Sequence, residues 1–351
     1  MRLEDFGTPA GEWLSSTGPD SDLVISSRIR LARNLDDHLF ISQADSRQRG
    51  LVEEEVRDAI EALESSVGLS FIGLKALPNI DRMVLVERHL ISREHAFTQG
   101  DRGVAFNPGE DTAIMVNEED HLRLQVMSSG FQLRETWQAM NALDSALEGY
   151  LSYAFDPQYG YLTACPTNVG TGLRASVMLH LPALVMTRQI EKVFQAVTKI
   201  NLAVRGLFGE GTQALGDFYQ ISNQTTLGRS ELEIVENIES VLPQIIEYER
   251  TVRRTLLESK GDVLEDKVWR AFGVLSTARI ISSKETMESL SLVRLGINLG
   301  MLEHLSLGAV NELFLLTQPG HLQKMEGEEL DSTERDVTRA RFIRSFLESQ
   351  D

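Results

Sequence analysis

Acidic, imidazole and guanidinium side chains are crowded directly after an apolar run, in the sequence Asn117-Glu118-Glu119-Asp120-His121-Leu122-Arg123. The preceding residues, 112–116, have the composition of a buried strand. Carboxylates beside a histidine and an arginine contribute little to packing, whereas acid–base chemistry and substrate binding need such groups in one place. A solvated junction between a strand and a turn has the same composition, so this stretch alone leaves both interpretations open.

Arginines occur two residues apart in the sequence Ser26-Ser27-Arg28-Ile29-Arg30. On a strand, residues two apart project from the same face, so both guanidinium groups would point the same way. Paired guanidinium groups suit phosphate oxygens, and Arg123 and Arg174 could complete a cluster that faces a polyphosphate. Each arginine taken singly is explained as well by a surface charge, so the prediction depends on the grouping.

The sequence Cys165-Pro166-Thr167-Asn168-Val169-Gly170-Thr171 resembles the signature of the ATP:guanido phosphotransferases, the phosphagen kinase family. In that family this loop lies beside the guanidinium group of the acceptor, and the Asn-Glu-Glu-Asp-His-Leu-Arg segment carries the catalytic carboxylate. Both segments are present here in the family's order. Without the resemblance, the glycines at 170 and 172 would form only a weak glycine-rich loop.

Within this family the chain resembles the bacterial protein arginine kinases, from about Leu23 to Ala340. The loop 204–212 and the segment 86–92, with its His89, match nucleotide contacts of that branch. Only residues 1–22 precede the arginine-rich strand, where kinases of small substrates have a long helical domain. A fourth match is Arg335-Asp336-Val337-Thr338-Arg339-Ala340, which in this branch binds phosphoarginine at a regulatory site.

The resemblance implies an α+β fold, in which an antiparallel β-sheet flanked by helices, of the glutamine synthetase-like type, is followed by a helical region. We expect a short lead over residues 1–22, a catalytic domain over 23–255, and a helical domain over 256–351 for dimerisation and phosphoarginine binding. The resemblance also implies ATP contacts from Ser26, Ser27, Arg28, Ile29, Arg30, His89, Arg123, Arg174, Ala175, Ser176, Val177, Met178, Arg205, Gly206, Leu207, Phe208, Gly209 and Glu210.

The acceptor chemistry assigns a base. A guanidinium group has a pKa above about 12 and is a poor nucleophile until its proton is removed. We expect Glu119 to take that proton, while the arginines and Mg²⁺ neutralise the phosphates of ATP. Glu118 is expected to contact the substrate, although a structural acid paired with an arginine is the stronger alternative. Asp120 and His121 are expected to orient their neighbours.

Two further substrate contacts, Cys165 and Gln213, carry open alternatives. Cys165 is either a small buried filler or a reactive thiol near a cationic site, and the resemblance implies that it orients the substrate and is not a covalent nucleophile. Gln213 stands where the family has a second carboxylate, and an amide can accept a hydrogen bond but cannot act as a base. A weaker substrate contact follows, or an inactive enzyme if two carboxylates are required. His89 is explained nearly as well by a core histidine as by an adenosine contact.

The motif at 335–340 also has a plain explanation. On a helix, Arg335 and Arg339 share a face and Asp336 lies three residues before Arg339, which is the pattern of a salt-bridged surface. The kinase-like segments elsewhere favour a phosphoarginine pocket in which the arginines bind phosphate and Asp336 binds guanidinium. Product binding there would provide feedback.

Composition limits the function classes. With 34 Lys and Arg against 52 Asp and Glu, the formal charge of -18 disfavours nucleic acids and anionic lipids and suits cationic protein surfaces. No apolar run is long enough to span a membrane and no signal peptide is evident, so we expect a cytoplasmic protein. A single cysteine excludes an internal disulfide and a cysteine-based zinc cluster, and no metal ligands are predicted.

These features predict a kinase that phosphorylates arginine side chains of proteins with ATP and Mg²⁺. The alternatives are a kinase of free guanidino compounds and a phosphoarginine-binding adaptor without activity. The resemblance implies a homodimer, a zinc-binding activator protein, delivery of marked proteins to a Clp-type protease, and a role in stress response and protein quality control.

The positioning elements follow from periodicity. Strand-like runs at 82–86, 112–116 and 160–164 alternate with helix-like spacing over 43–66, 136–148 and 179–204. After Asn223 the strand pattern ends. The tetrapeptides Ser230-Glu231-Leu232-Glu233 and Ser282-Ser283-Lys284-Glu285 have the spacing of capping boxes that begin helices. Pro243 is expected to kink the first of these helices.

Overall fold

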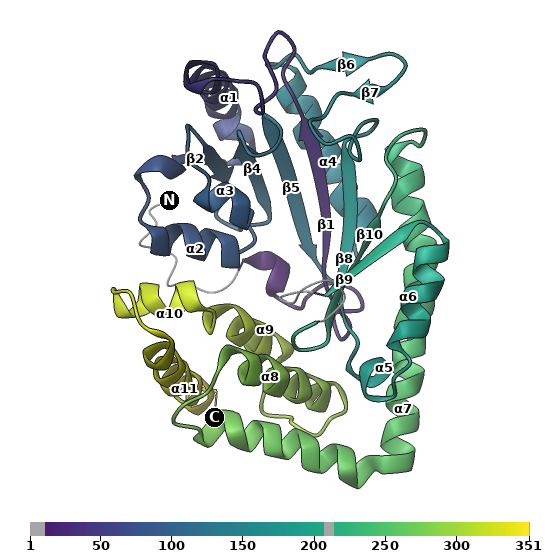
Figure 1. The fold of residues 1–351 in the computed structure, drawn as a ribbon. Coiled ribbons are helices and arrows are strands. Elements are labelled where there is room, and N and C mark those ends of the chain that lie inside the picture. The colour runs from purple at the N-terminus through teal and green to yellow at the C-terminus, as the bar shows by residue number, and fades with distance from the viewer. Residues whose placement is uncertain (1–10, 207–213, 351) are drawn as a thin grey trace.

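An eight-stranded antiparallel β-sheet forms the centre of the protein (Figure 1). The computed structural model describes residues 11–206 and 214–350. Every neighbouring pair of strands is antiparallel, which confirms the predicted antiparallel sheet flanked by helices. The strand order is β2 (Ser70–Gly73), β3 (Gly103–Phe106), β4 (Thr112–Val116), β5 (Leu122–Ser129), β1 (Val24–Arg33), β8 (Leu173–His180), β10 (Phe218–Asn223) and β9 (Leu202–Gly206).

One face of this sheet carries the main hydrophobic core. Alternate residues of the central strands, such as Ile29, Leu31 and Val177, are fully buried on this face. They pack with helices α1 (Ser46–Val67), α4 (Leu133–Glu148) and the first part of α7 (Glu231–Thr277). Short helices α5 (Pro182–Met186) and α6 (Ile190–Lys199) connect β8 to β9.

The opposite face is only partly covered. Helices α2 (Asn79–Glu87) and α3 (Arg93–Phe97), with the 3-10 turn η3 (Leu74–Ala76), pack on β3 and β4. At the other end, the 3-10 turn η2 (Glu12–Leu14) and helices α8 (Ser283–Asn298) and α9 (Leu307–Leu316) pack against Ile25, Met178 and Phe218. Between these two covers, the middle of β5, β1, β8 and β10 presents polar side chains to a hollow.

Helices make up the C-terminal part of the described chain: α7, α8, α9, α10 (Pro319–Glu326) and α11 (Ser332–Glu348). Ser230 and Glu233 form the predicted capping box of α7, and Ser282 caps α8 by accepting the Glu285 backbone N–H. Within α7 the backbone angles leave the helical range at Lys260 and not at Pro243. The helix is thus interrupted at Lys260, where φ is -145°, and a kink at Pro243 stays a prediction.

Three local predictions differ from the structure. Residues 82–86 were expected as a strand but lie in α2, where Val84 and Leu85 face the core on one side of a helix. The predicted strand 160–164 is reduced to β7 (Gly160–Tyr161), which pairs with β6 (Phe155–Asp156) in a small hairpin. The helix-like stretch 179–204 includes the end of β8 and the start of β9, because short apolar runs do not distinguish strand from helix.

The Glu87 carboxylate of α2 connects the sheet region to the helical region. The Glu87 carboxylate accepts the backbone N–H groups of Gly320 and His321 at 2.7 and 3.0 Å, at the first turn of α10. Two residues further along, His89 enters the hollow, so α2 connects the helical region to the polar face. Among the described helices, none combines the length and apolar character that crossing a membrane requires.

Candidate functional site

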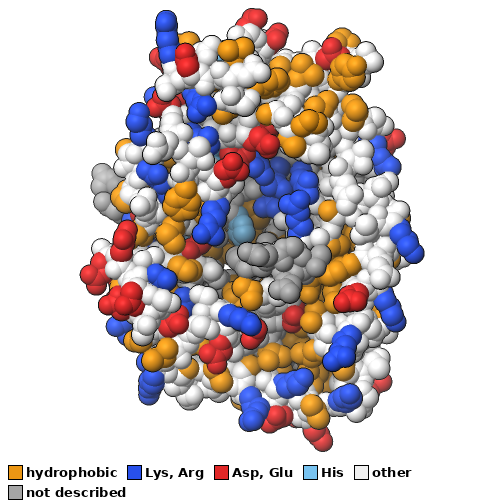
Figure 2. Space-filling model, in the orientation of Figure 1, with side chains coloured by type: hydrophobic (Ala, Val, Ile, Leu, Met, Phe, Trp, Pro, Cys, Tyr) orange, Lys and Arg blue, Asp and Glu red, His pale blue; other side chains and the backbone are white. Residues whose placement is uncertain are grey.

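Arginine side chains from four strands, β5, β1, β8 and β9, gather on the open face of the sheet. Arg28 and Arg30 of β1 lie on the same face, and Arg30 is paired in register with Arg174 of β8. Arg123 of β5 and Arg205 of β9 extend the group on either side. Figure 2 shows Lys and Arg side chains gathered in a hollow at the middle of this face, with acidic side chains on its upper rim. The predicted cationic cluster is thus brought together.

Neutral side chains position two of these cations, Arg28 and Arg174. Arg28 donates to Gln220 Oε1 at 2.5 Å and to Ser176 Oγ at 3.4 Å, and Arg174 donates to Ser222 Oγ at 3.1 Å. Burial, followed by the charges of Arg123 and Arg174, lowers the pKa of Arg28 to about 10. The pKa of Arg30 is lowered by burial and by the same neighbours, and its buried Nε has no hydrogen-bond partner. Such an arrangement is costly without an anion.

Glu118 is the structural acid of the pair. Its carboxylate accepts Arg123 Nη1 at 2.8 and 2.7 Å and the Ser92 hydroxyl at 2.5 Å. Burial alone raises the pKa of Glu118, but the Arg123 charge and the bonds from Ser92 and Arg123 lower it overall. Glu118 therefore remains ionised and orients Arg123. It also accepts the Glu119 backbone N–H at 3.3 Å.

Glu119 has a different environment although it is the adjacent residue. No other described residue makes a hydrogen bond or ion pair with its carboxylate, which lines the hollow beside Cys165 and Arg174. Partial burial, followed by the charges of Asp120 and Glu118, raises its pKa. A carboxylate with a raised pKa and free oxygens fits a group that accepts a proton.

Asp120 and His121 hold the turn in place. The Asp120 carboxylate accepts Asn34 Nδ2 and the Ala164 backbone N–H, both at 2.6 Å, and so joins this turn to the Cys165 loop. His121 Nδ1 accepts the Leu35 backbone N–H at 2.9 Å, and Nε2 lies 3.0 Å from the Leu39 carbonyl. Burial lowers the pKa of His121 to about 4, so the ring is a neutral orienting group.

Two hollows meet at Arg30 and Arg123. The first, of about 690 Å³ including solvent-open space, contains Glu118, Glu119, Asp120, Cys165, Thr167, Asn168, Arg174 and Arg205. The second, of about 760 Å³, extends past Arg28, His89, Ser92, Arg93 and Gln125. A phosphoryl group held by the two shared arginines would be reachable from both sides, as a donor and an acceptor require. The described residues include no cluster of three His, Cys, Asp or Glu side chains suited to a metal ion.

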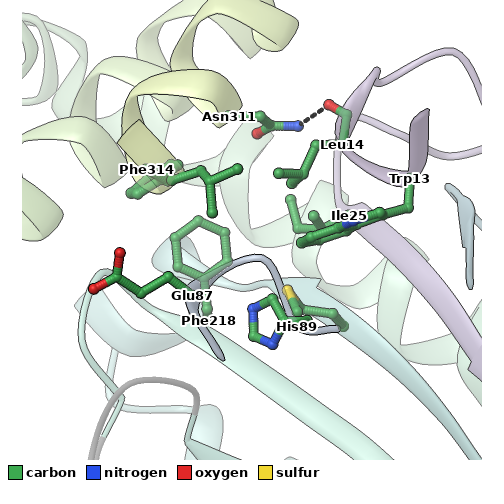
Figure 3. Close-up of a pocket in the computed structure, with 10 residues that line it drawn as sticks. Trp13, Leu14, Ile25, Glu87, His89, Phe218, Asn311 and Phe314 are labelled. Carbon is green, nitrogen blue, oxygen red and sulfur yellow. Dashed lines mark hydrogen bonds between the residues drawn. The ribbon is translucent and has the colours of Figure 1, made fainter. Parts of the chain in front are cut away.

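His89 lies between the second hollow and a small apolar one. Its backbone has φ of 60°, and its carbonyl accepts Gln125 Nε2 at 2.7 Å. Figure 3 shows the apolar hollow between the sheet and α9, with the His89 ring beside Trp13 and near Phe218. Burial, followed by the Arg28 and Arg30 charges, lowers the pKa of His89 to about 3. The neutral ring and its apolar neighbours suit an uncharged aromatic group.

Cys165 lies at the hollow and is not a core filler. Its Sγ is 3.0 Å from the Thr167 hydroxyl, and the residue is partly exposed. Thr226 fastens the same loop by contacting the carbonyl oxygens of Thr167 and Val169 at 2.9 and 2.8 Å.

Several described residues that are predicted to contact ATP do not line either of the two hollows that share Arg30 and Arg123. The side chains of Ser27, Ile29, Ala175 and Val177 lie on the side of the sheet that carries the core, so they cannot reach the cationic face. Ser26 is buried, and Met178 lines the apolar hollow. Gly206 ends β9. The predicted contacts Leu207, Phe208, Gly209, Glu210 and Gln213 lie outside the described residues.

The C-terminal motif is built into α11. Arg339 is 1% exposed and donates to the carbonyls of Thr317 and Ile281 at 2.9 and 3.0 Å. It also pairs with Asp336 at 2.5 Å, while Arg335 donates to the Leu330 carbonyl and Ala340 is buried. The solvated-surface alternative is therefore wrong for Arg339. Arg335 is partly exposed and is therefore more accessible than Arg339.

Sequence reasoning missed Ser92, Gln220 and Ser222 as positioning residues. The alternation of polar Gln220 and Ser222 with apolar Ile221 was a detectable strand signal for one polar face. Ser92 had no comparable signal, because its partner Glu118 is 26 residues away along the chain.

Replacing Ser92 with alanine is expected to reduce kcat about five- to tenfold, since one hydrogen bond to a charged group is lost and Arg123 is held less firmly. Ser92→Thr retains the hydroxyl and should restore most of the activity. Steady-state kinetics with varied ATP provide the measurement. An unchanged kcat in Ser92→Ala, with an unfolding temperature lowered by loss of the α3 cap alone, would show that Ser92 does not position Arg123.

Comparison with known sequences gives consistent matches. The sequence model of the ATP:guanido phosphotransferase C-terminal catalytic domain matches residues 51–252, and that of the protein-arginine kinase McsB C-terminal domain matches residues 261–351. A protein-arginine kinase of Halothermothrix orenii is 49% identical over 348 residues, covering 99% of both chains. Another, of Desulforamulus reducens, is 47% identical over 349 residues, covering 99% of this chain and 98% of the relative.

Solved structures agree at the level of the fold. The duplicated taurocyamine kinase of Schistosoma mansoni, with bound transition-state analogue components, superposes with a TM-score of 0.60 and 27% identity over 71% of this chain and 36% of that chain. Lombricine kinase superposes with a TM-score of 0.59 and 26% identity over 72% of this chain and 71% of that chain.

Proposed function

The chain belongs to the ATP:guanido phosphotransferase family, and from this premise we propose that it is a protein-arginine kinase. It transfers the γ-phosphoryl group of ATP to a guanidinium nitrogen of arginine residues in proteins. The observation that supports this most directly is the pair of hollows that share Arg30 and Arg123, with the Glu119 carboxylate on one side and His89 on the other.

The arginine cluster would bind MgATP, the donor substrate. Arg28, Arg30, Arg123, Arg174 and Arg205 supply fixed positive charge where the phosphates develop negative charge during transfer. The buried Arg30 Nε without a partner and the lowered pKa values of Arg28 and Arg30 support an anion as the intended partner. The magnesium ion enters with the nucleotide. His89 and the apolar hollow beside it would take the base.

Glu119 would remove the proton from the acceptor guanidinium as its nitrogen attacks the γ-phosphorus. The N–P bond forms as the bond from the γ-phosphorus to the bridging oxygen breaks, and ADP leaves with that oxygen. Glu118 would orient Arg123 and the backbone of Glu119. Cys165 would contact the acceptor and orient it without becoming a covalent nucleophile, and Gln213 would accept a hydrogen bond from it. Precise positioning accounts for most of the rate enhancement in such transfers.

The regulatory and cellular parts of the proposal rest on the family. Arg335, Asp336, Arg339 and Ala340 would bind phosphoarginine and report product. A homodimer formed through residues 256–351, a zinc-binding activator, and a Clp-type protease that receives marked proteins in the cytoplasm complete the proposal. The catalytic part stands without them.

The test is to incubate the purified chain with MgATP and an arginine-rich unfolded protein, and to search by mass spectrometry at neutral pH for acid-labile phosphate on arginine. Phosphoarginine on the protein is the expected result. Phosphorylation of free arginine but not of protein would favour a small-substrate kinase. No transfer, with retention of a phosphoarginine peptide that Arg335→Ala abolishes, would identify an adaptor.

A further inference from the structure

Four exposed apolar side chains belong to segments that adjoin the loops lining the hollow of Glu119 and Cys165. Leu39, Phe155, Tyr159 and Leu227 are 47%, 57%, 49% and 50% exposed, although side chains of this kind are usually buried. We call these four residues the apolar rim. They come from three segments far apart in the sequence, and each segment is connected to the turn of Glu119 or to the Cys165 loop. Exposed apolar groups that gather beside a site commonly bind a partner.

Leu39, the first residue of the apolar rim, is connected to the turn that contains Glu119 and Asp120. The Leu39 carbonyl lies 3.0 Å from His121 Nε2, and His121 adjoins Asp120 in the turn that presents Glu119. Because the neutral His121 ring is buried and bonded at both nitrogens, the position of Leu39 relative to this turn is well determined.

The aromatic members are attached to the Cys165 loop. The Phe155 ring packs edge-on against Tyr161, with 5.3 Å between centroids. Tyr161 in turn exchanges backbone hydrogen bonds with Gly170, at 2.8 and 3.3 Å. Cys165 is the fourth residue after Tyr161, so their Cα atoms are at most about 14 Å apart.

The hairpin that carries these aromatic groups is ordered before any partner binds. The Asp156 carboxylate accepts the backbone N–H groups of Gln158 and Tyr159 at 2.7 and 3.0 Å, which fixes the turn. The Arg33 guanidinium stacks on one face of the Tyr161 ring, with its Cζ 3.5 Å from the ring centre, and so holds the ring in place. Binding to such a surface loses little conformational entropy.

The fourth member is attached to the far side of the same loop. Leu227 follows Thr226, whose hydroxyl bonds the carbonyls of Thr167 and Val169. Gly170 has φ of +112°, and a side chain there would come within 2.8 Å of Leu227 Cα, so glycine is needed for this close approach. All three segments therefore adjoin loops that line the acceptor hollow. In Figure 2, apolar side chains also lie over β6 and β7, above the cationic hollow.

We propose that the apolar rim binds apolar side chains of the substrate polypeptide on either side of the target arginine, in an extended, unfolded segment. This inference rests on the proposed protein-arginine kinase function. An arginine that enters the hollow draws its neighbouring residues across the rim, and an extended chain advances about 3.3 Å per residue. Positions roughly four residues from the arginine would therefore reach Phe155 and Tyr159.

The rim would also select the folding state of the substrate. A folded protein presents arginine on its surface but keeps its large apolar side chains inside, whereas an unfolded segment presents both together. Aromatic rings with few rotatable bonds make effective anchors for such segments. The acidic residues that line the hollow, Glu118, Glu119 and Asp120, would favour the cationic side chain of the target arginine over neutral side chains next to it.

The test compares two peptides of about eleven residues, each with one central arginine; one has phenylalanine and leucine about four residues from the arginine, and the other has serine there. The full chain is assayed with MgATP as wild type and as two rim variants, Phe155→Ser/Tyr159→Ser and Leu227→Ser. The control is Ile200→Ser, because the Ile200 side chain is exposed and lies after α6. We expect the double variant to raise KM for the apolar peptide about tenfold, leaving kcat and the serine peptide unchanged. Ile200→Ser should match wild type.

The outcomes separate the two proposals. If wild type phosphorylates neither peptide, the kinase function fails and the rim proposal fails with it. If wild type phosphorylates both peptides equally and the double variant changes neither, the function stands and the rim proposal is overturned. A lower assembly mass of the double variant in sedimentation, with unchanged KM, would also overturn it, because the rim would then be covered by a second copy of the chain.

Discussion

Replacing Arg30 with methionine is expected to lower kcat/KM for MgATP by about 100- to 1,000-fold while raising the unfolding temperature of the ligand-free protein. Its guanidinium is held near Arg28, Arg123 and Arg174, and its Nε has no partner. Among the described residues, Arg28, Arg30 and Arg174 have no carboxylate partner, so their mutual repulsion is balanced only when an anion binds. Removing one charge relieves that cost and removes the phosphate contact with it.

Calorimetry with and without ATP measures both effects. Wild type should gain more in unfolding temperature from saturating ATP than Arg30→Met does, because ligand that binds only the folded state stabilises it. The matched control is Arg270→Met on α7, an exposed arginine paired with Asp266, which should change neither stability nor kinetics appreciably. A loss of stability in ligand-free Arg30→Met would contradict the idea of an uncompensated cationic cluster.

Replacing Glu119 with glutamine is expected to lower kcat about 100- to 10,000-fold, with little change in the stabilisation by MgATP. The amide has nearly the same shape but cannot take the guanidinium proton. Glu118 next to it cannot substitute, because Arg123 and Ser92 occupy its oxygens and its pKa is lowered. A Glu119→Gln enzyme that keeps more than about a tenth of the wild-type rate would show that the proton is transferred elsewhere.

The pH profile gives an independent test of the same base. Glu119 must be ionised to act, and burial with neighbouring Asp120 and Glu118 raises its pKa, so activity should rise with pH through a value above the ordinary range of glutamate. Glu94 also raises this pKa by its charge. Glu94→Gln should therefore keep kcat at high pH and shift the acidic limb of the profile to lower pH. An unshifted limb would indicate that another group limits the rate.

Local rules account for much of what could be predicted. The two-residue spacing of Arg28 and Arg30 places them on one face of any strand, the predicted capping box begins α7, and Ser282 caps α8. Such features depend on neighbours within four residues. The prediction of a strand at 82–86 failed because an apolar run of that length fits either structure, and packing of α2 against α10 decides for the helix.

The sequence by itself indicated the kind of chemistry, since the acidic turn, the arginine pair and the Cys165 loop resemble segments of the ATP:guanido phosphotransferases and occur in the same order. Only the tertiary structure decided which of two adjacent glutamates is free. Glu118 and Glu119 are the same residue type, and their pKa values are shifted in opposite directions by Ser92 and Arg123 on one side and by Asp120 on the other. Tertiary contacts likewise place Arg339 inside the helical region and connect the Leu39 carbonyl to His121. Ser92 lies 26 residues from Glu118, and Thr317 and Ile281 lie 22 and 58 residues from Arg339, so no local pattern encodes these contacts.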